Sequence, residues 1–218
     1  MGQIFHPSFN SLAKATLIGG ALLVGVVLAK GNVFFRSPYM TKVGVAREQV
    51  VPFSHKHHVA GLGLDCRYCH TAVEKSASAG IPSTKVCMTC HSQVWTEAPL
   101  LEPVRRSFAT GERLQWTRVH DVPDFVFFNH SIHVAKGVSC KTCHGRVDQM
   151  PLVWKENTLH MSWCLDCHRN PEKFIQPKET VFDMNFDPST LPENHGQQLV
   201  EKYGIHKEQL TNCSMCHR

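Results

Sequence analysis

The longest apolar stretch of the chain lies close to its start. Residues 15–29 carry no charge and read Ala-Thr-Leu-Ile-Gly-Gly-Ala-Leu-Leu-Val-Gly-Val-Val-Leu-Ala. A helix needs about 20 apolar residues to cross a bilayer. Lys14 and Lys30 can extend their ammonium groups to the interface, and phenylalanines lie just outside them, so the span lengthens to about 24 residues. We therefore predict a membrane-anchor helix within residues 1–36.

A cleaved signal peptide is the alternative for this stretch. Cleavage after Ala29 would need a small residue at position 27, where the chain has valine, so an uncleaved anchor is favoured. More lysines and arginines follow the span than precede it, and the positive-inside rule alone would place the N-terminus outside. Ala21, Gly25 and Ala29 form a stripe of small residues on which a partner helix could pack.

A short polar motif, Cys-x-x-Cys-His, dominates the rest of the chain. It occurs five times and accounts for all 10 cysteines. This motif is the attachment signal for haem c, in which both cysteines bond to the porphyrin and the histidine binds the iron. Structural zinc sites also combine paired cysteines with histidine, but zinc does not require a histidine directly after every second cysteine. The sequence therefore predicts five haem c groups.

The predicted covalent attachment residues are Cys66, Cys69, Cys87, Cys90, Cys140, Cys143, Cys164, Cys167, Cys213 and Cys216. The predicted proximal ligands are His70, His91, His144, His168 and His217. Because haem c is attached outside the cytoplasmic membrane, we expect the residues after the anchor to be exported. This requirement outweighs the charge count, and it predicts a periplasmic haem domain on the bacterial inner membrane.

Two parts of the chain repeat one plan. Phe53-Ser54-His55 leads to the first two motifs, and Phe128-Asn129-His130 leads to the third and fourth. The first cysteines of corresponding motifs are 74 and 77 residues apart, which indicates an internal duplication. We predict a first two-haem module in residues 37–110, a second in 111–175, and a single-haem segment in 176–218.

The duplicated plan also suggests the distal iron ligands. His55, His58, His130 and His133 recur in both halves, three residues apart within each pair. Such a pair shares one helix face and cannot easily serve one iron, so each pair is expected to ligate two different haems. The fifth distal ligand is open among Met161, His160 and His120. A methionine would raise the potential of its haem, whereas His120 could instead hydrogen-bond a propionate.

The space needed by five haems predicts the fold class. About 180 residues follow the anchor, or roughly 36 for each haem, so the porphyrins must supply most of the apolar core. We expect a multihaem cytochrome c made of short α-helices and irregular coil around stacked haems, with few or no strands. The net charge of +5 omits the haems and does not indicate nucleic-acid binding.

The motifs resemble the pentahaem cytochrome c subunit of bacterial alternative complex III, over nearly the whole chain. The resemblance rests on Phe53-Ser54-His55, Leu64-Asp65-Cys66-Arg67-Tyr68-Cys69-His70, His120-Asp121-Val122-Pro123-Asp124-Phe125, Phe128-Asn129-His130 and Met161-Ser162-Trp163-Cys164-Leu165-Asp166-Cys167-His168-Arg169. It implies partners in a quinol-oxidising membrane complex: an iron–sulfur subunit, multi-helix quinol-binding subunits, and a monohaem cytochrome c or a terminal oxidase. It also favours Met161 over His160 as a ligand, although His160 departs from the family pattern.

We therefore expect an electron-transfer subunit that is not itself an enzyme, relaying electrons from the quinol-oxidising complex to a downstream acceptor. Each iron would carry two protein ligands and leave no position for a substrate. A self-sufficient, one-helix quinol dehydrogenase is the main alternative. A multihaem reductase is less favoured, because its catalytic iron would need an open position and this chain offers as many candidate distal ligands as haems.

Overall fold

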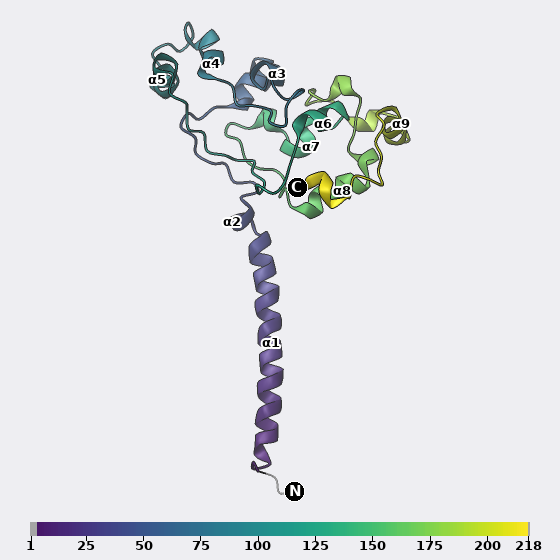
Figure 1. Cartoon of the computed structure of the whole chain (residues 1–218). Coiled ribbons are helices and arrows are strands. Elements are labelled where there is room, and N and C mark those ends of the chain that lie inside the picture. Colours follow the sequence, from purple (N-terminus) through teal and green to yellow (C-terminus); the bar gives the residue numbers. More distant parts are fainter. Residues whose placement is uncertain (1–3, 218) are drawn as a thin grey trace. The chain divides into compact units, whose positions relative to one another are not determined.

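The computed structural model describes residues 4–217 and divides the chain into two units, one up to Val43 and one from Gly44 onward. The first unit contains α1 (Ser8–Arg36) and the single turn α2 (Pro38–Thr41). Helix α1 has 29 residues, buries none of them, and is long and apolar enough to cross a membrane (Figure 1). It ends at Arg36, before Ser37-Pro38, where proline disfavours helical geometry in the preceding residue.

The second unit is built from short helices joined by irregular chain (Figure 1). Its α-helices are α3 (Cys66–Cys69), α4 (Thr84–His91), α5 (Glu102–Thr110), α6 (His130–Ala135), α7 (Cys140–His144), α8 (Met161–Arg169), α9 (His195–Lys202) and α10 (Cys213–Cys216). A π-type turn, η1 (Lys56–Gly61), precedes α3. No β-strand is assigned in residues 4–217, where isolated bridges join Val126 with His217 and Val138 with Ile175. The predicted fold class is confirmed.

The haem motifs coincide with these short helices. Helices α3, α4, α7, α8 and α10 each carry one Cys-x-x-Cys pair, which places its two cysteines on one side of a turn. At α3, the Asp65 carboxylate caps the helix by accepting a hydrogen bond from the Arg67 amide at 2.8 Å. Helices of four or five residues are unstable by themselves, so they depend on packing or on an attached group.

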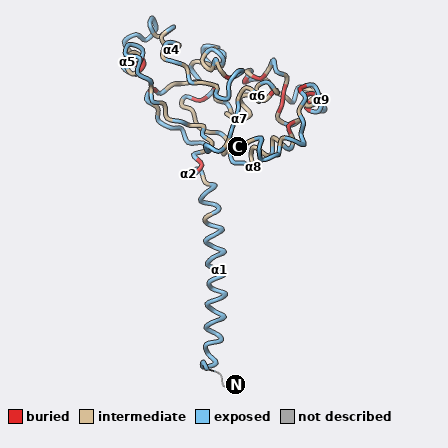
Figure 2. Tube along the Cα trace, viewed as in Figure 1, coloured by how far each residue is buried: buried red, intermediate tan, exposed pale blue. Residues whose placement is uncertain are grey.

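Little of the second unit is a protein-only core. One small cluster contains Val51, Leu101 and Val104, and another contains Ile175, Leu199 and Tyr203. Figure 2 shows only scattered buried residues along the trace. The surface area is 15025 Å², against roughly 10,000 Å² for a compact protein of this mass. The exposed α1 contributes to this excess, and so do apolar side chains around the haem motifs.

The proline-containing stretch after residue 176 folds into short turns. It contains the 3₁₀ turns η5 (Lys178–Thr180) and η6 (Pro188–Thr190) before α9. The Gln176 side chain holds the first of these turns by donating to the Thr180 carbonyl at 2.7 Å. Proline presets one backbone angle for such turns, and local side-chain bonds of this kind complete them.

Gly137 permits a close approach between α6 and the chain after the fourth motif. Its φ of +79° lies in the left-handed region, and an added Cβ would collide with the Gln176 carbonyl oxygen and lie 2.9 Å from the Tyr203 ring.

We predict that Gly137→Ala destabilises the protein by about 3 kcal/mol, because backbone strain and steric overlap add. Gly111→Ala is the matched control, since Gly111 has φ of +77° but no neighbour within 4 Å; strain alone costs about 1–2 kcal/mol. Thermal unfolding followed by circular dichroism measures the difference, and equal losses in both variants would contradict it.

Candidate haem-iron centres

The five motifs form five candidate centres, which we number in chain order. They are centre 1 (Cys66, Cys69, His70), centre 2 (Cys87, Cys90, His91), centre 3 (Cys140, Cys143, His144), centre 4 (Cys164, Cys167, His168) and centre 5 (Cys213, Cys216, His217). All ten cysteines are free of disulfides, and all are intermediate or exposed. They are therefore available for covalent attachment to a large planar group.

The ring of each motif histidine is oriented through its Nδ1 atom. In four centres Nδ1 lies within hydrogen-bond distance of a main-chain carbonyl: His70 to Gly80 at 2.6 Å, His91 to Val94 at 3.1 Å, His168 to Leu210 at 2.8 Å and His217 to Phe125 at 3.2 Å. A carbonyl can only accept, so Nδ1 carries the proton and Nε2 is left as the free ligand atom. In centre 3 the partner of His144 Nδ1 is instead Nε2 of His120, at 3.1 Å.

Three of the predicted distal histidines face a motif histidine. The ring centres are 6.3 Å apart for His58 and His91, 6.4 Å for His130 and His144, and 6.3 Å for His133 and His168. A metal–imidazole bond is about 2 Å and a ring nitrogen lies about 1.1 Å from its ring centre, so two rings on opposite sides of one metal have centres roughly 6.3 Å apart. All three pairs have the spacing that a six-coordinate iron requires.

His55 lies near centre 1. Burial, followed by the charge of His70, lowers its pKa to about 4. Its Nδ1 atom is buried and has no hydrogen-bond partner within residues 4–217, whereas His58 Nδ1 bonds the Ser54 carbonyl at 2.8 Å. A neutral imidazole is the form that binds a metal, so the environment of His55 suits a ligand.

Each distal pair is held by a phenylalanine at its start. The Phe53 ring stacks on His58 at 4.3 Å and meets His55 edge-on at 4.9 Å. Phe128 repeats this arrangement, stacking on His133 at 4.6 Å and meeting His130 edge-on at 4.7 Å. The two halves thus share side-chain geometry as well as sequence. In the sequence these phenylalanines mark only the repeat, although the pattern Phe-x-His-x-x-His could have indicated their contact with both rings.

The candidates for the fifth distal ligand differ in their surroundings. His120 is engaged by His144 through the hydrogen bond described above. Met161 begins α8 and is 60% exposed. It is one turn before Cys164 and therefore on the same helix face. His160 is the exposed N-cap residue of α8, and His57 stacks on Trp95 at 6.1 Å, away from the motif histidines.

Neighbouring thiols reveal which centres adjoin. The Cys66 and Cys140 thiols interact with each other, and this interaction lowers the pKa of Cys66 and raises that of Cys140. Burial, followed by the charges of Cys167 and Cys164, raises the pKa of Cys143 to about 12. Centre 1 therefore adjoins centre 3, and centre 3 adjoins centre 4.

The remaining two centres adjoin the ends of this group. Burial, followed by the charge of Cys87, raises the pKa of Cys69, and burial with the charge of Cys216 raises the pKa of Cys164. In addition, His168 of centre 4 is bonded to the carbonyl of Leu210, three residues before Cys213. Centre 2 thus adjoins centre 1, and centre 5 adjoins centre 4.

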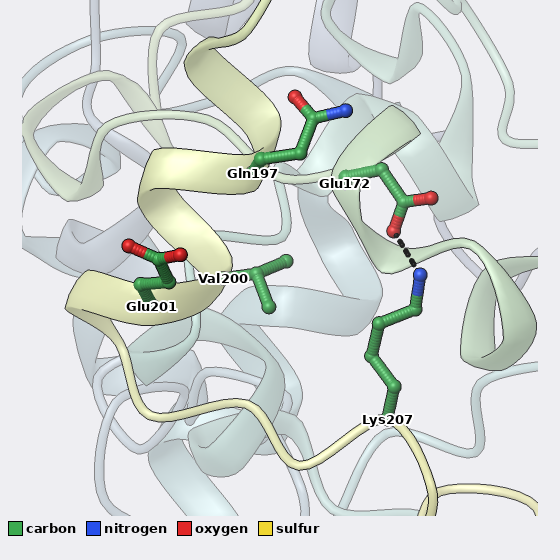
Figure 3. Close-up of a pocket in the computed structure, with 5 residues that line it drawn as sticks. All are labelled: Glu172, Gln197, Val200, Glu201 and Lys207. Atoms are coloured by element: carbon green, nitrogen blue, oxygen red, sulfur yellow. Dashed lines mark ion pairs between the residues drawn. The ribbon is translucent and has the colours of Figure 1, made fainter.

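One hollow of the second unit is lined by none of the motif residues. It has a volume of about 290 Å³ and is lined by Glu172, Gln197, Val200, Glu201 and Lys207 (Figure 3). Lys207 pairs with Glu172 at 2.9 Å across it, an exposed ion pair contributing about 0–1 kcal/mol. No cysteine or histidine lines the hollow. Across residues 4–217, no three His, Cys, Asp or Glu side chains converge as a tetrahedral zinc site would require.

Comparisons with known proteins agree with this geometry. The family described as cytochrome c3 matches residues 132–218, and the family described as cytochrome c7 and related cytochrome c matches residues 51–102. The chain is 31% identical, over 74% of its own length and 87% of the relative's, to the menaquinone reductase multihaem cytochrome c subunit of Nitratidesulfovibrio vulgaris (strain Hildenborough). Cytochromes of these families carry covalently bound haem c. The chain belongs to the multihaem c-type cytochromes of the c3/c7 kind.

Proposed function

We propose that the chain is a membrane-anchored pentahaem electron relay in a quinone-linked complex. The observation that carries the proposal is the spacing of 6.3–6.4 Å between three pairs of histidine rings. Irons with two protein ligands have no open position for a substrate, which favours electron transfer over catalysis by this chain. When bound, each haem c supplies a one-electron Fe(III)/Fe(II) couple.

The axial ligands that we propose follow the facing pairs. His55 and His70 would hold the iron of centre 1, and His58 and His91 that of centre 2. His130 and His144 would serve centre 3, and His133 and His168 centre 4. Each distal pair then joins two centres within one helical turn. For centre 5 we propose His217 and Met161, because Met161 shares a helix face with Cys164 and the Cys164 thiol is a neighbour of Cys216.

The contacts between thiols support one spatial order of the centres: 2, 1, 3, 4, 5. In this order the two modules, residues 37–110 and 111–175, would meet at centres 1 and 3. The chain's role would be to hold adjacent irons close together and to tune each of them through its two ligands. Centres 2 and 5 are then the ends at which electrons enter and leave.

The quinone link rests on the relative, whose name describes a subunit of a menaquinone reductase. Helix α1 would anchor the chain in the bacterial inner membrane, with the haem domain in the periplasm where haem c is attached. The resemblance to alternative complex III suggests iron–sulfur, multi-helix quinol-binding and monohaem cytochrome c subunits as partners, with a cytochrome c or terminal oxidase as acceptor. The relative's name permits the opposite direction, towards quinone, and the two-ligand centres serve either.

A self-sufficient quinol dehydrogenase is the second candidate, and the test is direct. We predict that the purified full chain in detergent binds five haems and is fully reduced by dithionite but not by a menaquinol analogue. The reason is that the hollow lined by Glu172, Glu201 and Lys207 carries three charged side chains and no motif residue, a lining that does not suit a quinol ring. The matched control is the complex purified with its partners, which the same quinol should reduce. Rapid quinol-driven reduction of the chain alone would overturn the relay in favour of the dehydrogenase.

A further inference from the structure

The hydrogen bond between His120 and His144 separates centre 3 from the other four. The other motif histidines have Nδ1 beside main-chain carbonyls, the usual acceptors for a metal-bound histidine. Only His144 has a side chain there, with Nδ1 3.1 Å from Nε2 of His120. The two rings meet edge-on, with centres 4.2 Å apart and planes at 73°.

The contact with His120 occupies one ring nitrogen of His144 and leaves the other nitrogen free. The rings of His130 and His144 are nearly parallel, at 8°, with centres 6.4 Å apart. His144 therefore has one nitrogen for the metal side and the other for His120. An arrangement with His120 as the axial ligand opposite His144 does not fit, because ring centres 4.2 Å apart leave no room for a metal between them.

His120 is partly buried, and its Nε2 atom is the one that lies beside Nδ1 of His144. A neutral imidazole with a free Nε2 accepts a proton more strongly than an amide carbonyl. The chain next to it is fixed by an ion pair between Arg118 and Asp121 at 3.0 Å and by a hydrogen bond from Arg47 to the Arg118 carbonyl at 2.8 Å.

We propose that His120 is a positioning residue for centre 3: by accepting the Nδ1 proton of His144, it fixes that ring and lowers the potential of the attached haem. A strong acceptor at Nδ1 makes His144 a more basic ligand, and a more basic ligand stabilises the ferric state over the ferrous state. Centre 3 is the middle of the proposed order, so His120 would lower the potential of the middle haem of the relay. The inference rests on the proposed haem attachment and not on the quinone link.

The experiment is a redox titration of the full-length holoprotein in detergent, with His120→Phe as the first variant. Phenylalanine keeps the ring shape and removes the acceptor. We expect one of the five midpoint potentials to rise, the other four to stay, and the low-spin electron paramagnetic resonance signal of one haem to shift. His120→Gln returns an amide oxygen as acceptor and should give a smaller rise in the same midpoint. His206→Phe, which removes an exposed histidine that is not a candidate ligand, should shift none.

Three results would overturn the proposal. One is an unchanged set of midpoints in His120→Phe with all haems attached. Another is a new high-spin signal in His120→Phe, because it would show that His120 is an axial ligand. Should His120→Phe not load its haem, His120→Gln decides: an upward shift supports the proposal, and an unchanged midpoint refutes it. These readings use the isolated chain without quinol, so a failed relay test would leave them unaffected.

Discussion

Replacing His58 with alanine is expected to convert one of the five ferric haems from low spin to high spin. His58 faces His91 at 6.3 Å between ring centres. Its ring is fixed by Phe53 on one face and by the Ser54 carbonyl at Nδ1. Removal leaves an open or water-bound position, which weakens the ligand field of that iron. All five haems should stay attached, because attachment depends on the cysteines.

The neighbouring histidine is the matched control for this prediction. His57→Ala removes the same side chain one residue earlier, where the ring is exposed and stacks on Trp95. Electron paramagnetic resonance of the oxidised proteins should show a high-spin signal of about one haem per chain for His58→Ala and none for His57→Ala. The ligand assignment fails if both variants remain low spin. It also fails if His57→Ala is the variant that changes.

Replacing Met161 with histidine is expected to lower the midpoint potential of one haem by roughly 0.1 V or more, within the span of about 0.8 V that axial ligands control. A thioether favours ferrous iron relative to imidazole, so Met161 would make centre 5 the high-potential end of the relay. The residue is 60% exposed at the start of α8. Redox titration monitored by visible absorption measures the shift.

Two further variants separate Met161 from the alternatives. Met215→Leu removes another exposed thioether, within the centre 5 motif itself, and should leave all potentials unchanged because Met215 lies between the attachment cysteines. His160→Ala should be equally silent. If His160→Ala generates a high-spin haem while Met161→His changes nothing, then His160 is the fifth distal ligand and the assignment of Met161 is wrong.

The sequence alone determined which residues can attach haem and what the chain is built from. Attachment is local chemistry: two cysteines and a histidine within five residues need only one turn of helix, and all five motifs lie on such turns. The apolar helix was equally predictable, because length and hydrophobicity over residues 15–29 are local properties. The absence of a large apolar core in the rest of the chain predicted short helices and few strands, and residues 4–217 contain isolated bridges but no strand.

The tertiary structure alone decided which histidines face one another and what fixes them. His133 lies seven residues before Cys140 but faces His168, and His120 lies 24 residues before the ring that it contacts. These pairings depend on how irregular segments fold back on each other, a process that no periodicity of hydrophobic and polar residues encodes. The carbonyls that orient the motif histidines are likewise main-chain groups, and every sequence has them at every position. Only the folded chain selects the ones that lie beside each ring, because their placement depends on the path of the backbone.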